Sequence, residues 1–249
     1  MSAYEDLAYV YDTYMLHAPY DKWFMFSKQC FGLFSSGIDN IIDLGCGTGE
    51  IANRLAADNY AVTGVDYSEE MLAIAQQKAA DKAVNIQWLH QDMRELVGLT
   101  NYDAVVSFCD VLNYVTSIED VQQVFEQVNQ SLKVDGLFIF DVHALDYVEH
   151  HLIDQTFADV DTNNAYIWFC TPGDNEGEMF HDLTFFMEQD GVYKRFDETH
   201  HQRTFSIQTY EKLLKQTNFE LIHICADFSL DKEVDNESER IFFIAKKRS

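Results

Sequence analysis

The sequence of 249 residues predicts an α/β fold, in which a doubly wound, mostly parallel seven-stranded sheet carries a small antiparallel β cap. Between residue 40 and about 145, short apolar runs typical of buried strands alternate with apolar residues at helical spacing. Such alternation produces right-handed βαβ crossovers and therefore a parallel sheet. After that point the chain is rich in β-branched and aromatic residues up to Arg203, which predicts the cap.

These patterns divide the chain into two parts. Residues 1–145 and 204–249 are predicted to form the α/β domain, and residues 146–203 an inserted β-rich cap. Residues 1–36 are rich in aromatic side chains and are predicted to form an N-terminal helical lid.

The elements follow in order along the sequence. The main sheet is expected from strands at 40–44, 61–66, 84–92, 103–108, 136–142, 219–228 and 240–247, of which the last two suit an antiparallel hairpin. Helices are expected at 49–57 and roughly 207–217, and two more begin where Ser68 and Ser117 can cap their first turns. Asp190-Gly191 is the predicted turn of a hairpin within the cap.

Charge and cysteine content narrow the class of protein. The formal net charge of −25 repels phosphate backbones and anionic lipid, so nucleic-acid and membrane partners are disfavoured. Five scattered cysteines without a CxxC pair favour free thiols in a reducing cytoplasm over disulfides or a metal site. The first residues do not resemble a secretory signal, and no apolar run is long enough to cross a bilayer.

A glycine-rich turn follows the first strand and precedes a helix. Gly45, Gly47 and Gly49 let backbone N–H groups approach a nucleotide closely, where a Cβ would collide. Asp66 ends the next strand, where a carboxylate can accept hydrogen bonds from both ribose hydroxyls.

Two details oppose a dinucleotide at this turn. The G-x-G-x-x-G fingerprint requires a glycine at position 50, which is Glu50 in this sequence. Asp43 would repel a pyrophosphate, whereas it would attract a ligand that carries a sulfonium and an ammonium group. An alternative role for Asp43 is to anchor the loop by accepting hydrogen bonds from backbone N–H groups.

Five ordered motifs give the sequence a resemblance to class I S-adenosylmethionine-dependent methyltransferases. They are DLGCGTGEIA (43–52), VTGVDYSEEML (62–72), LHQDMREL (89–96), YDAVVSFCDVLNYV (102–115) and LKVDGLFIFDVH (132–143). The resemblance covers about 1–145 and 205–249, and it implies a Rossmann-like methyltransferase fold with S-adenosylmethionine as cofactor and S-adenosylhomocysteine as product.

The resemblance also implies a set of cofactor-binding residues. Asp66 would bind the ribose, Tyr67 and Met71 would lie near the adenine, and Asp92 would bind the adenine amino group with Met93 beside it. The loop would contribute Asp43, Gly45, Cys46 and Gly47, and Cys109 would contact the cofactor through its backbone.

The N-terminal stretch YEDLAYVYDTYMLHAPYDKW (4–23) resembles the same part of the bacterial YqeM-like methyltransferases and, more loosely, of sugar N-dimethyltransferases. That resemblance implies that Tyr11 and Tyr20 close over the methionine end of the cofactor, with Trp23 as a wall of the pocket. The alternative is an amphipathic helix that only packs its aromatic residues on the core.

Methyl transfer from a sulfonium needs mainly alignment of the acceptor behind the methyl carbon, and a base only where the acceptor is protonated. Candidates for a catalytic role follow the fourth and fifth strands: Asn113 and His143, each of which has a structural alternative. Adjacent histidines, at 150–151 and 200–201, point to opposite faces of a strand and chelate a metal poorly, so no metal site is expected.

The function predicted from these observations is N- or O-methylation of a small-molecule acceptor. An acidic cap suits a neutral or cationic substrate, such as an amine. The alternatives are methylation of a protein or an RNA, a non-catalytic scaffold that binds the cofactor, and a nicotinamide dehydrogenase, which Glu50 and Asp43 oppose.

Overall fold

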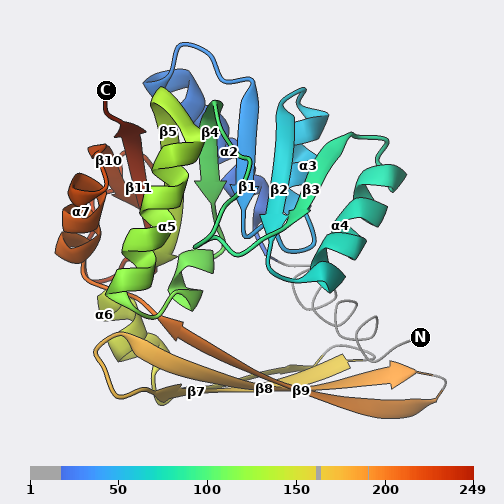
Figure 1. Ribbon diagram of the computed structural model, residues 1–249. Coiled ribbons are helices and arrows are strands. Elements are labelled where there is room, and N and C mark those ends of the chain that lie inside the picture. Colours follow the sequence, from blue (N-terminus) through green and yellow to red (C-terminus); the bar gives the residue numbers. More distant parts are fainter. Residues whose placement is uncertain (1–17, 161–163, 190) are drawn as a thin grey trace.

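The computed structural model describes residues 18–160, 164–189 and 191–249 (Figure 1). The predictions for Tyr11, for Asp190 and for the first part of the N-terminal lid therefore lie outside the described residues. None of the described helices is both long and apolar enough to cross a membrane.

The main sheet has seven strands in the order β10-β11-β5-β4-β1-β2-β3, which confirms the predicted fold class. Strands β1 to β5 run parallel to one another, whereas β11 is antiparallel to β5 and β10 is antiparallel to β11. The strand bounds are β1 (Asn40–Leu44), β2 (Ala61–Asp66), β3 (Ile86–His90), β4 (Tyr102–Ser107), β5 (Leu132–His143), β10 (Phe219–Ala226) and β11 (Arg240–Lys247). The strand order reverses between β1 and β4, and in such sheets ligands bind at the carboxyl ends of the strands next to that point.

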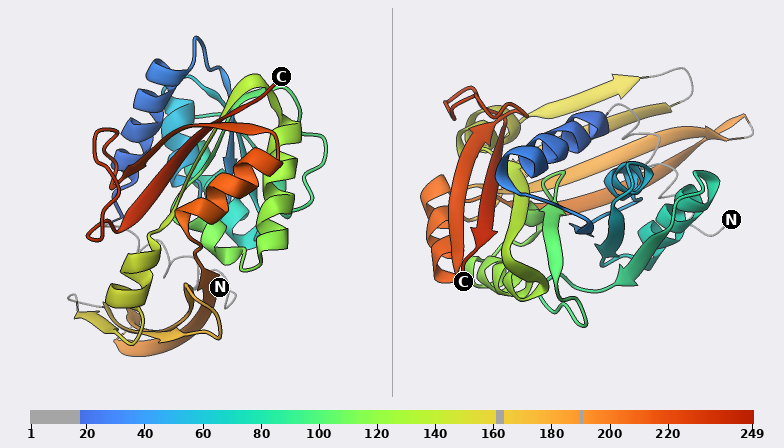
Figure 2. Two further views of the ribbon diagram at one scale, coloured as in Figure 1. Left: turned by 90° about the vertical axis from the view of Figure 1, so that its left-hand side faces the viewer. Right: turned by 90° about the horizontal axis from the view of Figure 1, so that it is seen from above.

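Helices cover both faces of this sheet (Figure 2). One face carries α2 (Tyr20–Phe34), α3 (Glu50–Ala57) and α4 (Glu69–Asp81), and the other carries α5 (Ile118–Ser131) and α7 (Ile207–Gln216). The predicted caps are confirmed, because the side chains of Ser68 and Ser117 accept hydrogen bonds from the N–H groups of Met71 and Asp120. These caps satisfy orphan donors in the first turn of α4 and of α5.

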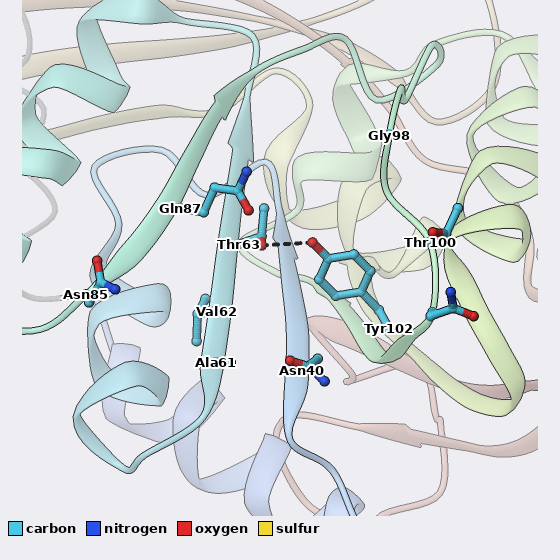
Figure 3. A pocket seen from close by; sticks show the side chains of 10 residues that line it. Asn40, Ala61, Val62, Thr63, Asn85, Gln87, Gly98, Thr100 and Tyr102 are labelled. Atoms are coloured by element: carbon cyan, nitrogen blue, oxygen red, sulfur yellow. Dashed lines mark hydrogen bonds between the residues drawn. The ribbon is translucent and has the colours of Figure 1, made fainter.

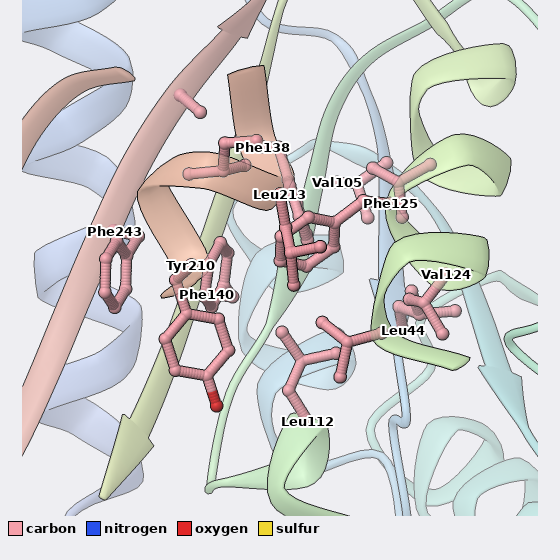
Figure 4. Packing of buried hydrophobic residues seen from close by; sticks show 14 of the residues in the cluster. Leu44, Val105, Leu112, Val124, Phe125, Phe138, Phe140, Tyr210, Leu213 and Phe243 are labelled. Carbon is pink, nitrogen blue, oxygen red and sulfur yellow. The ribbon is translucent and has the colours of Figure 1, made fainter. Parts of the chain in front are cut away.

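The larger core cluster lies between the sheet and the α5/α7 layer, and aromatic rings dominate it (Figure 4). The rings of Phe140 and Phe243 stack at a centroid distance of 4.9 Å, and Phe125 packs edge-on against Phe138 at 5.4 Å. Close packing of this kind fixes the strands whose carboxyl ends form the site.

Several strand ends differ from the predicted ones. The third strand is shorter at both ends, at Ile86–His90 instead of 84–92, and the fourth lies one residue earlier, at Tyr102–Ser107 instead of 103–108. The fifth strand begins at Leu132 instead of residue 136, because the left-handed Asp135 (φ 64°) bends the strand without ending it. The tenth strand ends at Ala226 instead of residue 228, since Asp227 and Phe228 adopt left-handed backbone angles that no extended strand contains.

A second sheet of four antiparallel strands lies across the arrowhead ends of the parallel strands (Figure 1). It consists of β6 (Thr156–Val160), β7 (Asn164–Pro172), β8 (Glu178–Gln189) and β9 (Val192–Arg203), in chain order. Pairing of Gln189 with Val192 gives the predicted two-residue connection, in which Gly191 has a φ of 82°. Two short helical turns, α6 (Leu145–Tyr147) and η3 (Val148–Leu152), connect β5 to this sheet.

Candidate active site

The loop between β1 and α3 requires glycine at its first turn. Gly45, Gly47 and Gly49 all have positive φ, at 74°, 51° and 78°. A Cβ built on Gly45 would lie 2.2 Å from Cγ1 of Val111, the first residue of the short 3₁₀ helix η2 (Val111–Tyr114). The absence of a side chain at Gly45 therefore lets η2, which follows β4, pack directly against the glycine loop.

Asp66 fixes the position of the same loop from the end of β2. Its Oδ2 accepts a hydrogen bond of 2.7 Å from Gly47 N, and its Oδ1 accepts one of 2.9 Å from Ser68 N. The carboxylate is thus held at the carboxyl end of the sheet, beside the turn where a ribose is expected.

Asp43, at the end of β1, is a buried carboxyl group with one unpaired oxygen. The side chain is only 2% exposed, and its Oδ2 has no hydrogen-bond partner among the described residues. Burial, together with the nearby charge of Asp66, raises the pKa of Asp43 to about 7, although the N–H of Ala52 donates to the carboxyl group and opposes the shift. Asp43 therefore helps to hold the start of α3, and its unpaired oxygen fits a cationic ligand.

The predicted adenine-binding residues lie along the ends of β2 and β3. Tyr67 is 74% exposed, Met71 is half-buried in the first part of α4, and Met93 packs against the larger core cluster. Asp92 accepts hydrogen bonds of 2.6 to 3.2 Å from the guanidinium group of Arg94, which lowers the pKa of its carboxyl group. An adenine amino group at Asp92 would share the carboxylate with Arg94, a partner that the sequence analysis missed although it lies two residues away.

Cys109 and Asp110 turn the chain at the end of β4. Both have left-handed backbone angles, with φ of 61° and 52°. Burial and then the Asp141 carboxylate raise the pKa of the Cys109 thiol well above its usual value, so the thiol stays protonated at neutral pH. A protonated thiol is a poor nucleophile, so the backbone of Cys109, and not its thiol, remains the group expected to contact a cofactor.

A network of buried charges joins the ends of β4, β5 and β11. Arg240 donates to Oδ1 of Asp110 at 2.9 Å and to Oδ2 of Asp141. Asp141 also accepts from Nε1 of Trp23 at 3.1 Å, which connects α2 to the sheet. Burial opposes ionisation of Asp110, but His143 and Arg240 hold its pKa well below the usual range.

The two predicted catalytic residues have different surroundings. Asn113 is fully buried, and its amide group accepts from His143 N at 3.0 Å and donates to Arg203 O at 3.0 Å. Nε2 of His143 lies 3.6 Å from Oδ1 of Asp110, whereas its Nδ1 is buried without a hydrogen-bond partner among the described residues. Both amide atoms of Asn113 are therefore used to clamp backbone segments together.

The four-stranded sheet reaches this network through a chain of directed hydrogen bonds. Trp168 Nε1 donates to His181 Nδ1 at 2.9 Å, His181 Nε2 pairs with Gln202 Oε1 at 3.1 Å, and Gln202 Nε2 donates to Asp110 Oδ2 at 3.0 Å. Burial lowers the pKa of His181 to about 4, so its imidazole is neutral. Each of these hydrogen bonds is therefore donated in the same direction, from Trp168 toward Asp110. Sequence reasoning missed Gln202 and Arg240, because their partners lie far away along the chain.

Histidines of the two adjacent pairs have partners within the protein. His150 Nδ1 bonds to the Asp146 carbonyl, and His201 pairs with Glu178 at 2.7 Å. No group of three potential metal ligands exists among the residues that the structure describes.

On the N-terminal side of the site, Tyr20 packs on Trp23 at a ring-centroid distance of 6.1 Å, and the Arg54 guanidinium lies 5.5 Å from the Tyr20 ring centroid.

A hollow of about 460 Å³ lies at the opposite, amino end of the strands (Figure 3). It opens at the starts of β1 and β2, near Asn40 and Ala61, and Thr63 bonds to the Tyr102 hydroxyl at 2.9 Å on its wall. Its lining is uncharged and lies away from the glycine loop, so it is not part of the candidate active site.

Comparisons with known proteins agree with this geometry. A family model described as a methyltransferase domain matches residues 41–136. The chain is 45% identical over 245 residues to YqeM of Bacillus subtilis (strain 168), a protein named as a methyltransferase, and the match covers 98% of this chain and 97% of that protein. GWCH70_2453 of Geobacillus sp. (strain WCH70), also named as a methyltransferase, is 44% identical over 246 residues, with coverage of 98% and 99%.

Solved structures share the whole fold. The crystal structure of a S-adenosylmethionine-dependent methyltransferase from Clostridium acetobutylicum ATCC 824 matches with a TM-score of 0.90 at 27% identity and covers 100% of both chains. The sugar N-methyltransferase KedS8 from Streptoalloteichus sp ATCC 53650 matches with a TM-score of 0.79 at 16% identity, over 97% of this chain and 93% of that chain. The unpaired oxygen of Asp43 beside a glycine loop fits the cationic cofactor of such enzymes. The chain therefore belongs to the YqeM-like family of methyltransferases and is an enzyme that uses S-adenosylmethionine.

Proposed function

We propose that the enzyme methylates a nitrogen or oxygen atom of a small-molecule acceptor held between the two sheets. The observation that carries this proposal is the face that the four-stranded sheet turns toward the cofactor loop. His181 and Gln202 lie on that face and reach Asp110, so residues at alternate positions of the same paired strands lie there too. That face bears aromatic and acidic side chains, namely Tyr166, Phe185, Phe196 and Glu198.

The cofactor is proposed to lie over the glycine loop. S-adenosylmethionine supplies an activated methyl group on a sulfonium. The loop residues Asp43, Gly45, Cys46 and Gly47 would hold its methionine end, together with Tyr11, Tyr20 and the backbone of Cys109. Asp66 would bind the ribose, and the adenine would lie among Tyr67, Met71, Asp92 and Met93.

The remaining parts of the chain would place the acceptor and exclude water. Residues 146–203 would cover the acceptor, and residues 1–36 would act as the lid over the methionine end. Asn113 and His143 would position the ends of β4, β5 and β9, because Asn113 bonds only to backbone atoms and His143 faces Asp110. Alignment of the acceptor behind the methyl carbon would supply much of the rate.

The charge of the site favours an acceptor that carries an amine. Glu198 and Asp110 are partly buried carboxylates near the inner face, and the whole chain has a net charge of −25. KedS8, which is titled as a sugar N-methyltransferase, supports an N-methylated small molecule. An RNA acceptor is disfavoured by the charge, and no specific observation favours a protein acceptor. Five free thiols suit a reducing compartment, so the cytoplasm is proposed as the location.

The direct test is a transfer experiment with methyl-labelled S-adenosylmethionine and a cell extract that has been separated into metabolite, protein and RNA fractions. We expect the label to enter the metabolite fraction with the wild-type enzyme and not with the Asp66→Ala variant. Label confined to the protein or RNA fraction would contradict the small-molecule proposal. Absence of transfer to all three fractions would favour the non-catalytic alternative.

A further inference from the structure

Tyr114, His200 and Glu198 form a second series of hydrogen bonds at the junction of the two sheets. The Tyr114 hydroxyl lies 3.0 Å from His200 Nδ1, and His200 Nε2 lies 2.9 Å from Glu198 Oε2. The His200 and Glu198 side chains are 27% and 17% exposed, whereas Tyr114 is 49% exposed. The Tyr114 ring is thus partly open to solvent, whereas its hydroxyl is sheltered: burial, followed by the nearby charges of Asp110 and Glu198, raises the pKa of that hydroxyl well above its usual value.

This series of hydrogen bonds lies close to the proposed cofactor loop. Tyr114 ends η2, and the first residue of that 3₁₀ helix, Val111, packs against Gly45. Glu198 and His200 lie two residues apart on β9, so both side chains project from the same face of the strand. Asn113 attaches η2 to β9 through its bond to Arg203 O, which keeps Tyr114 and His200 in register.

The hydrogen bonds fix the direction in which a proton can move. An ionised carboxylate only accepts hydrogen bonds, so the proton of a neutral His200 lies on Nε2, toward Glu198. Nδ1 of His200 must then accept the hydrogen of the Tyr114 hydroxyl. The Gln202 side chain also bonds to that hydroxyl oxygen, which keeps one lone pair for a further donor. This order is the one that a base relay requires, since each member can pass a proton inward.

The neighbouring histidine has the opposite arrangement. His181 lies directly across from His200 on β8, but its Nδ1 is already occupied by the indole N–H of Trp168. Its Nε2 hydrogen is directed at Gln202, so it offers no free acceptor to a substrate. Among the charged groups near the relay, Asp110 shares the Arg240 cation with Asp141 and also faces His143, which leaves Glu198 as the carboxylate bonded to His200.

We propose that Tyr114, His200 and Glu198 form the proton-accepting relay for the methyl acceptor, an inference that rests on the proposed function. As a lone pair of the acceptor atom forms the new bond to the methyl carbon, the bond between that carbon and sulfur would break and its electron pair would stay on the sulfur. The proton of the acceptor hydroxyl, or of the methylated ammonium that a neutral amine acceptor becomes, would pass to the oxygen of Tyr114, and the phenol hydrogen would pass to Nδ1 of His200. Glu198 positions the imidazole and stabilises the imidazolium that results.

The first experiment needs no acceptor. In protein labelled with ¹⁵N at histidine, long-range ¹H–¹⁵N spectra at pH 7.5 report which ring nitrogen carries hydrogen. We expect His200 to be neutral and protonated at Nε2, and we expect its Nδ1 shift to change in Tyr114→Phe. A His200 ring that is protonated at Nδ1 or doubly protonated at this pH could not accept a proton from Tyr114 and would overturn the proposal.

The second experiment measures the rate with the metabolite fraction that accepts label from the wild-type enzyme. General bases contribute about 10²–10⁴-fold, so kcat should fall by about 100-fold or more in His200→Gln and Tyr114→Phe, and by about 10-fold in Glu198→Gln. Cofactor affinity, measured by calorimetry, should change by less than about twofold, since none of the three contacts the cofactor in this account.

His201→Gln is the matched control, because His201 is the next residue on the same strand and faces the other side of the sheet, where it pairs with Glu178. It should keep the wild-type rate. A His200→Gln variant with a wild-type rate would overturn the relay alone. A wild-type enzyme that binds the cofactor and labels no metabolite would overturn the proposed function, and the relay with it.

Discussion

Two buried aspartates at the carboxyl end of the parallel sheet show how differently the same side chain can be used. At the end of β5, both oxygens of Asp141 have partners, which are Arg240, Trp23 and the N–H of Asp110. At the end of β1, Asp43 is equally buried, but one of its oxygens has no partner among the described residues. Arg240 supplies a cation to Asp141, whereas no cation reaches Asp43 from the part of the chain that the structure describes.

The difference separates a structural site from a binding site. A buried ion pair that is fully hydrogen-bonded holds the ends of strands together, whereas an unpaired buried carboxyl group costs stability. A cationic ligand at Asp43 can offset that cost when it binds. Substitutions at the two sites should therefore change the free energy of unfolding in opposite directions.

The largest effect is expected from Arg240→Met, which leaves Asp110 and Asp141 without their cation. Removal of one partner from a buried ion pair typically costs about 3–5 kcal/mol, so the free energy of unfolding should fall by that amount. Denaturant titration measures it. The control is Arg195→Met, whose exposed pair with Asp197 should leave the midpoint unchanged. Equal small effects in the two variants would show that the buried network does not stabilise the fold.

At Asp43 the sign of the effect should be reversed. Folding raises the pKa of this acid from 3.8 to about 7, so the native state binds the proton more tightly than the unfolded state does. The free energy of unfolding without cofactor should therefore fall as the pH rises between those two values. Asp43→Asn removes the cost of ionisation and should be more stable than the wild type at pH 8, by about 2–4 kcal/mol. The advantage should shrink toward pH 4, and a less stable variant at pH 8 would contradict the account.

The contact between the glycine loop and η2 should not tolerate a side chain at Gly45. Gly45→Ala combines a positive φ of 74° with a Cβ at 2.2 Å from Val111, so it should cost about 2–3 kcal/mol and weaken cofactor binding. Gly98→Ala has a similar φ of 77° and no atom within 4 Å of its new Cβ. It should show the backbone strain alone, with unchanged cofactor affinity by calorimetry.

Asp66→Ala should weaken binding of S-adenosylmethionine by about 1–3 kcal/mol, the range for loss of a buried hydrogen-bonding partner. The variant also removes the acceptor of Gly47 N and Ser68 N, so thermal unfolding without cofactor should be measured alongside. An unchanged affinity would remove Asp66 from the proposed ribose site.

The smallest effect is expected from Tyr20→Phe, which removes one hydroxyl and keeps the ring on Trp23. If the hydroxyl binds the methionine carboxylate, the dissociation constant should rise by about three- to tenfold, equivalent to about 1 kcal/mol. A ring that only packs on the core would leave the constant unchanged.

Asp43, Gly45 and Asp66 could be predicted to lie near one another because a strand, a turn, a helix and the next strand follow in one short stretch of chain. The succession of strands and helices along the chain and the caps at Ser68 and Ser117 followed from similarly local patterns. Sequence reasoning could assign these features because each depends on residues within a few positions.

The polar junction between the sheets could not be predicted in this way. Arg240 and Asp110 are 130 residues apart along the chain, and Gln202 and Asp110 are 92 apart. Alternation along β8 and β9 separates two faces, but only contacts with η2 and Asp110 show which face turns inward. Partners of this kind depend on the packing of the sheets, which no short stretch of sequence specifies.

The most direct test of the central contrast is calorimetry of S-adenosylmethionine binding at pH 7, in two buffers with different ionisation enthalpies. Asp43 has a pKa of about 7, so about half of the molecules carry its proton before the cationic cofactor binds. Because the cationic cofactor favours the ionised carboxylate, we expect the wild type to release about 0.5 proton more than Asp43→Asn when it binds the cofactor. We also expect the wild type to bind the cofactor more tightly. Equal proton counts and equal affinities in the two proteins would contradict it.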